Sequence, residues 1–298
     1  MAGESSKKSV LVAVDHPERA AQLVRTGSDI AALTGSSVRV VTVAVKPRNS
    51  PFGVFEDATI IQEYAADSRA ILSRATNVAP GGVEVDGEVI VGTSVAAGIL
   101  EAVERQNPGA VVIGWDDQRG HRDTILGSTV DRLLKRLPCD LYVERIGAMA
   151  NGVDSVLLPV AGGPHVTPAA MAAKSIAVRN RASIEVLAIA GGDVNESDAQ
   201  SFREVGVETV EGLPGPPVTV TTRLTSSEVV PDEIVAVASE HDVIVFGATR
   251  QGALKRRFVG SIPRLVAERT DRTVILGRSG EAIAERPWGL TRIWSSIR

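Results

Sequence analysis

Short apolar runs alternate along the chain with segments of helical length. In the first half, mostly apolar, Val-rich runs predict five buried strands: VLVAV, VRVVTVAV, VEVDGEVIVG, AVVIG and DLYVER. Helices are predicted between them at about 18–34, 57–77, 95–106 and 128–137. Runs of this kind suit a sheet that is covered on both faces. Because strands that alternate with helices are joined by right-handed crossovers, the pattern predicts a parallel α/β sheet.

The second half repeats the first, with predicted strands at VLLPV, IEVLAIA, VTVTTRL, DVIVFG and TVILG. Gly114 and Gly127 are 13 residues apart, as are Gly247 and Gly260. The halves are offset by 146 residues at the opening strands and by 133 at these glycines, so the second copy has lost a net 13 residues. A repeat in such register indicates a tandem duplication. We therefore expect two α/β doubly wound domains, at residues 8–147 and 153–280, and a C-terminal tail at 281–298.

Composition narrows the class of protein. The 298 residues are 44% hydrophobic and 23% charged, which is ample material for globular cores. A formal net charge of −4 argues against a nucleic-acid partner, since such binding relies on a basic excess. The single Cys139 excludes an internal disulfide, and no apolar run reaches the 18 residues of a membrane span. These features predict a cytoplasmic protein with no integral membrane segment.

The stretch GWDDQRGHRDTILGST, residues 114–129, lies between a predicted buried strand and a predicted helix. A glycine-rich turn at a helix N-terminus is a common place to hold phosphate groups. Asp116 and Asp117 would repel phosphates, unless one of them holds Mg²⁺. These residues alone are compatible with three interpretations: a nucleotide-binding site, a nucleotide-binding site with altered chemistry, or a loop that only connects the strand to the helix.

The chain resembles the universal stress protein family, in its tandem form. The resemblance rests on the opening VLVAVD, on the glycine that ends AVVIG, and on LGST thirteen residues later. VGSI takes the place of LGST in the second copy. The resemblance implies Rossmann-like domains that bind ATP or a related adenine nucleotide, with Mg²⁺ as a candidate companion, at the carboxyl ends of the strands. It also implies a role in the stress response. Pairing of the last strands, LYVER and TVILG, would make an internal pseudo-dimer, and a homodimer of the whole chain stays open.

The family's nucleotide-binding motif, G-x2-G-x9-G-[ST], implies candidate binding residues in both copies. Asp117 and Arg250 stand where the motif has its second glycine, and Ala161 replaces the acid that ends the first strand. The way in which these loops would bind phosphate groups is therefore expected to be altered. The candidate cofactor-binding residues are Asp15, Val43, Ile113, Gly114, Gly127, Ser128 and Thr129 in the first copy, and Gly247, Gly260 and Ser261 in the second.

The chain shows no Ser/His/Asp set and no P-loop lysine, and its four histidines lack metal-ligand spacing. We therefore expect no catalytic residue and no metal site, and interpret the chain as a regulatory module that binds a nucleotide or an unknown protein partner. One alternative is a weak ATP-hydrolysing or phosphotransfer enzyme that uses the acids of the first site. Another is a cytoplasmic regulator of a membrane transporter, which the apolar and basic tail ERPWGLTRIWSSIR favours.

Overall fold

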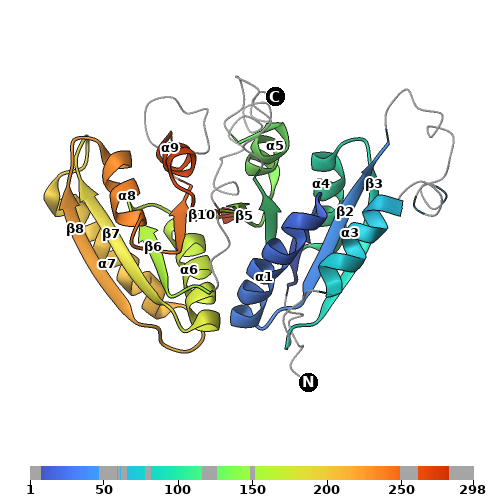
Figure 1. The fold of residues 1–298 in the computed structure, drawn as a ribbon, viewed down its shortest axis with the longest axis horizontal. Helices are drawn as coiled ribbons and strands as arrows, with labels where there is room; N and C mark the ends of the chain where they lie inside the picture. Colours follow the sequence, from blue (N-terminus) through green and yellow to red (C-terminus); the bar gives the residue numbers. More distant parts are fainter. Residues whose placement is uncertain are drawn as a thin grey trace, which may run out of the picture.

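The computed structural model describes residues 8–46, 59, 61, 66–77, 82–115, 126–147, 152–248 and 261–281. Ten strands lie within them, five in each half of the chain (Figure 1). The strands are β1 (Val10–Ala13), β2 (Val38–Val45), β3 (Val85–Gly92), β4 (Ala110–Gly114), β5 (Asp140–Arg145), β6 (Ser155–Pro159), β7 (Ser183–Ala190), β8 (Val220–Ser226), β9 (Val243–Gly247) and β10 (Thr273–Arg278).

Helices connect successive parallel strands in each half. The helices of the described residues are α1 (Pro17–Thr34), α3 (Ala66–Asn77), α4 (Val95–Gln106), α5 (Ser128–Arg136), α6 (Val166–Asn180), α7 (Glu196–Gly212), α8 (Val230–Ala238) and α9 (Ser261–Arg269). Their starts have recognisable local causes: Pro17 occupies the first turn of α1, and the Ser94 hydroxyl accepts a hydrogen bond from the Ala97 N–H at the start of α4.

All ten strands form one sheet, in the order β3-β2-β1-β4-β5-β10-β9-β6-β7-β8. Pairing is parallel within each half, as predicted. The two halves meet where β5 and β10 pair antiparallel, with Val143 opposite Leu276. The predicted pairing through the last strand of each copy is therefore confirmed, and a single chain builds the internal pseudo-dimer.

Helices cover both faces of this sheet. The core on one face joins buried residues of α1, α3, α6 and α7. The core on the other face joins α4, α5, α8 and α9. Each core runs through both halves, and α1 packs beside α6 across the junction (Figure 1). Both halves thus share continuous apolar layers, while α5 and α9 lie on the same side of the molecule (Figure 1).

Most of the predicted elements agree closely with the structure. Of the helix predicted at about 57–77, the structure shows α3 from Ala66 to Asn77, and most of residues 57–65 lie outside the described residues. The start of β3 is two residues later than expected, at Val85, and β8 is displaced toward Ser226. Between β2 and β7 the starting residues differ by 183 − 38 = 145, and between β3 and β8 by 220 − 85 = 135, so most of the 13 lost residues fall between the second and third strands.

None of the helices in the described ranges is both long and apolar enough to cross a membrane.

Candidate functional site

In each half the strand order changes direction beside the first strand, and the fold places a candidate ligand crevice at the carboxyl ends of the strands there. In the first half, β1 lies between β2 and β4, and Ala13 is opposite both Val41 and Ile113. Helix α1, which follows β1, and helix α5, which follows β4, lie on opposite faces of the sheet. Ligands in open α/β sheets bind at such a point, because the loops diverge and leave a space between them.

Four of the predicted first-half residues come together at this edge. Asp15 is exposed two residues beyond the end of β1. The register of Ala13 with Val41 brings Val43 to the same level on β2. Ile113 is buried at the end of β4, and Gly114 follows it. The structure therefore assembles an acid, two apolar side chains and a bare backbone segment at one end of three adjacent strands.

The start of α5 supplies the remaining predicted residues of the first half. Gly127 is the N-cap residue, and its φ of 99° is one that residues with a side chain rarely adopt. Gly127 has no side chain to accept a hydrogen bond, so the N-cap residue itself offers no acceptor to the backbone N–H groups of the first turn, which includes Ser128 and Thr129. A Cβ on Gly127 would meet no atom within 4 Å. The loop with Asp116 and Asp117 lies outside the described residues.

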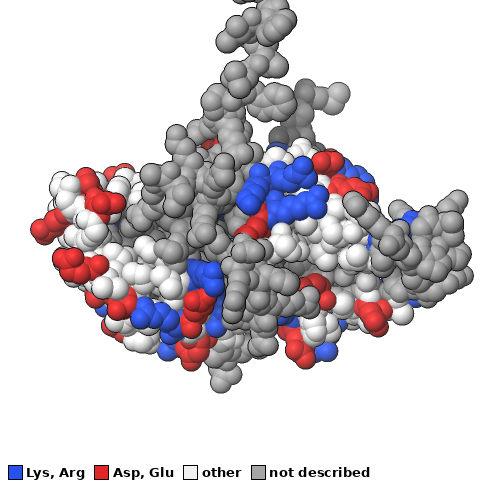
Figure 2. Space-filling model, turned by 90° about the horizontal axis from the view of Figure 1, so that it is seen from above, with Lys and Arg blue, Asp and Glu red and all other residues white. Residues whose placement is uncertain are grey.

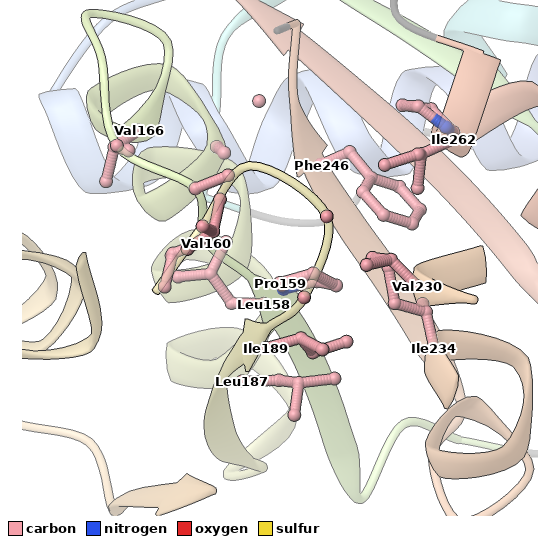
Figure 3. Close-up of a pocket in the computed structure, with 18 of the residues that line it drawn as sticks. Leu158, Pro159, Val160, Val166, Leu187, Ile189, Val230, Ile234, Phe246 and Ile262 are labelled. Carbon is pink, nitrogen blue, oxygen red and sulfur yellow. The ribbon is translucent and has the colours of Figure 1, made fainter. Parts of the chain in front are cut away.

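The second half contains a cavity of about 230 Å³ at the corresponding edge (Figure 3). Strands β6, β7 and β9 and the first turns of α8 and α9 enclose it. Gly247 lines it, as predicted for a binding residue. Gly260 and the basic residues near Arg250 lie outside the described residues, and for Ser261 only the helical backbone is described. Most of the wall is aliphatic or aromatic: Leu158, Leu187, Ile189, Val230, Ile234, Phe246 and Ile262.

Strand registers relate the two crevices residue by residue. Pro159 is opposite Leu187 as Ala13 is opposite Val41, so Ile189 corresponds to Val43. By the same registers and the 133-residue offset, Ala161 corresponds to Asp15, Phe246 to Ile113, and Ile262 to Thr129. All four of these second-half residues line the cavity. The positions inferred for the first half therefore have counterparts around an actual cavity, and each counterpart is apolar.

Helix α6 lies closer to its strands than α1 does. A Cβ on Gly247 would lie 2.8 Å from the carbonyl oxygen of His165, and one on Gly277 would lie 2.9 Å from the backbone nitrogen of Ala169. The buried His165 also accepts a hydrogen bond at Nδ1 from the Ser279 N–H, over 3.0 Å. Because both glycines allow direct backbone contact, the start of α6 is pressed onto β9 and β10.

Helix α1 instead leaves room for side chains at the equivalent place. A Cβ on Gly114 would lie 3.4 Å from Leu23 Cδ1 and 3.7 Å from Arg19 Cδ, which are ordinary contacts. Gly114 is paired with Glu144 as Gly247 is paired with Gly277. In the second half, helix α6 occupies the space above Gly277, and in the first half the Glu144 side chain fills the equivalent space. Gln22 Nε2 donates a hydrogen bond to Glu144 Oε1 over 3.0 Å.

Two buried carboxyl groups mark the junction between the halves. Burial raises the pKa of Glu144 to about 7, although hydrogen bonds with Thr26 and Gln22 lower it. Burial also raises the pKa of Asp29 to about 7, against the opposing effect of Arg179 and Arg25. Asp29 borders a small cavity of about 60 Å³ between α1, α6 and β10. The protonated form of both groups is therefore favoured by the folded state.

Other reactive side chains of the described residues do not add to either crevice. Burial raises the pKa of the Cys139 thiol to about 11, so the thiol is a packing group. In the part of the chain that the structure describes, no group of His, Cys, Asp and Glu side chains is arranged to hold a metal ion. The residues that sequence reasoning missed are the second-half wall residues Val230, Ile234, Phe246 and Ile262. Extending the repeat register through every strand would have located Phe246 and Ile262.

A family model for the universal stress protein family matches residues 7–145. A universal stress protein from Archaeoglobus fulgidus has a similar structure, with a TM-score of 0.62 and 17% identity over 92% of this chain and 97% of that one. A putative universal stress protein from Pseudomonas aeruginosa gives 0.58 and 16% identity over 94% and 96%.

The cytoplasmic domain of a prokaryotic cation chloride cotransporter gives a TM-score of 0.58 at 12% identity, over 93% of this chain and 99% of that one. Among curated proteins, no sequence matches this chain. These structural likenesses span both halves and show a shared fold. Residues 7–145 thus match the universal stress protein family, and the second half of the chain repeats the same strand order.

Proposed function

We propose that the chain is a regulatory binding module of the stress response whose first half binds an adenine nucleotide. The observation that carries this proposal is the arrangement at the first crevice. There Asp15, Val43, Ile113 and Gly114 share one end of the sheet, and α5 begins without a side-chain cap. The match of residues 7–145 to the family supports a nucleotide as the ligand.

Each side chain of the first crevice suits one part of such a ligand. Val43 and Ile113 offer apolar surface to a base, and the exposed Asp15 carboxylate can accept hydrogen bonds from ribose hydroxyls. The N–H groups in the first turn of α5 favour a phosphate, because the helix dipole is positive there. Mg²⁺ would accompany the phosphates.

The charge on the surface above the first half also favours an anion. Lys and Arg side chains gather right of centre when the molecule is seen from above (Figure 2). Helix α5 contributes three exposed basic residues, Arg132, Lys135 and Arg136. Positive potential near a crevice raises the local concentration of anionic ligands and their rate of association.

Calorimetric titration of the full chain with ATP and Mg²⁺ tests the proposal. We expect a single binding event, weakened roughly tenfold or more in Asp15→Ala, because a hydrogen bond to a charged group contributes about 1.5–3 kcal/mol. Asp193→Ala, an exposed acid at the rim of the second cavity, is the matched control and should leave ATP affinity unchanged. Absence of ATP binding in the parent chain would contradict the proposal.

The enzymatic alternative has its own measurement. Phosphate release from ATP, followed over hours, should stay at the rate of a protein-free control. Release that depends on Asp15 would favour the hydrolase or phosphotransferase instead of the binding module.

A second candidate function is regulation of a membrane transporter. The fold shared with the cytoplasmic domain of a cation chloride cotransporter favours it. The tail at 282–298, which lies outside the described residues, would then serve in recruitment. Removing the tail should abolish co-sedimentation with membranes of the source cells, and unchanged co-sedimentation would count against this function.

A further inference from the structure

We propose that the cavity of the second half binds a small, uncharged aromatic molecule instead of a nucleotide. The inference rests on the proposed function in one respect: both assume that ligands bind at the carboxyl ends of the strands. It assigns different ligand classes to two crevices of one chain.

The walls of the cavity are apolar on opposite sides. Val230 and Ile234 of α8 and Phe246 of β9 line one side, and Leu158, Leu187 and Ile189 of β6 and β7 face them (Figure 3). Phe246 is 4% exposed and Ile234 is 3% exposed, so the protein holds these side chains in place before any ligand enters. Such a slot favours a flat apolar ring, which would pack against aliphatic groups and the Phe246 ring.

The size of the cavity limits the ligand to one or two rings. An apolar protein cavity of roughly 150 Å³ is large enough to hold benzene. At about 230 Å³, this cavity has room for a fused bicyclic molecule such as indole or naphthalene.

The described part of the cavity wall offers a phosphate group little charge or hydrogen bonding. Among the described residues that line the cavity, Asp193 alone is charged, and it is exposed at the rim. Ala161 removes the carboxylate that Asp15 offers in the first half, and Ile262 replaces Thr129. Pro263, in the first turn of α9, has no N–H to donate. Burying a phosphate against these residues would cost free energy without a compensating charge or hydrogen bond.

The rim leaves an entrance that suits a flat molecule. Gly162, Gly163, Gly191 and Gly192 all line or adjoin it with positive φ. A Cβ on Gly162 would lie 2.7 Å from the Phe202 ring, whereas Gly163 and Gly192 face open space. At these four glycines the rim is therefore bare backbone, narrow at Gly162 and open at Gly163 and Gly192.

Saturation-transfer NMR on the full chain, with indole and naphthalene as probes, tests this assignment. Both probes should bind the parent protein. Val230→Trp fills the slot and should weaken binding by about tenfold or more, because the space for the ring is lost. Ala161→Asp places a carboxylate at an exposed position of the rim, where it is compatible with folding, and should weaken binding several-fold. Asp15→Ala is the matched control and should leave probe binding unchanged.

The outcomes separate this inference from the proposed nucleotide site. Probe binding that Asp15→Ala leaves intact and both second-half variants weaken would support the assignment, even in a chain that fails to bind ATP. Absence of probe binding, or binding that neither second-half variant changes, would overturn it. Competition by adenosine or ATP for the probes would also overturn it, because the cavity would then be a nucleotide site.

Discussion

The two halves differ most in how the first helix of each lies on its strands. Helix α6 touches β9 and β10 through backbone contacts at Gly247 and Gly277. Helix α1 stands off the equivalent strands, and Arg19, Leu23 and the Gln22–Glu144 pair fill the intervening space. One strand order thus supports two arrangements, a close backbone contact and a layer of side chains.

The same difference continues into the crevices. In the first half, the positions at the carboxyl ends of the strands carry Asp15 and Thr129, and in the second they carry Ala161 and Ile262. The duplicated fold has kept the geometry of a ligand edge and has changed its chemistry. We infer that the copies diverged in ligand class while the sheet and its two cores stayed continuous.

The largest expected effect comes from Glu144, whose equivalent in the second half is Gly277. A carboxyl whose pKa rises from 4.5 to about 7 on folding binds its proton more tightly in the folded protein. Its contribution to stability is therefore greatest below pH 4.5, decreases between pH 4.5 and 7, and stays at its lower level above pH 7. Glu144→Gln should raise the free energy of unfolding at pH 8 by about 3 kcal/mol.

Urea unfolding of the parent and of Glu144→Gln at pH 5 and pH 8 measures this effect. The difference between the two proteins should grow from pH 5 to pH 8. The exposed Glu208→Gln on α7 is the control and should give no such growth. An equal difference at both pH values would show that the charge on Glu144 is not what costs stability.

A pair of glycine substitutions tests whether α6 packs more closely on its strands than α1 does. Gly247→Ala should destabilise the chain by about 2 kcal/mol, because the new methyl group would press on the His165 backbone. Gly114→Ala, at the equivalent position, should change stability by less than about 1 kcal/mol, since its new contacts are ordinary. Thermal unfolding of the two variants checks the comparison, and equal losses would contradict it.

The smallest effect concerns the helices that border the two crevices. Ser94 caps α4 by accepting a hydrogen bond from the Ala97 N–H over 3.2 Å, whereas Val229, 51% exposed, precedes α8 and offers no side-chain cap. Ser94→Ala should cost about 1 kcal/mol of stability. Val229→Ser should stabilise the second half by about 0.5 kcal/mol, and a loss on that substitution would contradict the interpretation.

Much of the fold followed from local patterns in the sequence. Val-rich runs located every strand to within a few residues, most closely where a strand such as β4 or β9 is buried on both faces and has no polar positions. The edge strands β3 and β8, which carry exposed polar residues, were predicted to start two residues too early. The antiparallel join of β5 and β10 did not follow from periodicity, since it depends on which strand edges meet. The family resemblance led only to the expectation that the last strands pair. The strand register confirms that pairing and shows that it is antiparallel.

The candidate sites were only partly predictable. Gly114 was identified because the G-x2-G-x9-G-[ST] motif names it, and Asp15 because the family resemblance places an acid at the end of the first strand. Strand pairing then brought the two to one edge. The apolar cavity was not predicted, because Val230 and Ile234 belong to α8, and no sequence motif includes that helix. The contact of His165 with Gly247 depends on the start of α6, one turn of helix later than a simple offset of the halves suggests.

The central claim is that the two crevices take different ligand classes at the same time. Titrating indole into the full chain, first without ATP and then with saturating ATP and Mg²⁺, tests this most directly. We predict the same indole affinity in both titrations, because the ligands occupy different halves. Loss of indole binding in the presence of ATP would contradict the account, since both ligands would then compete for one crevice.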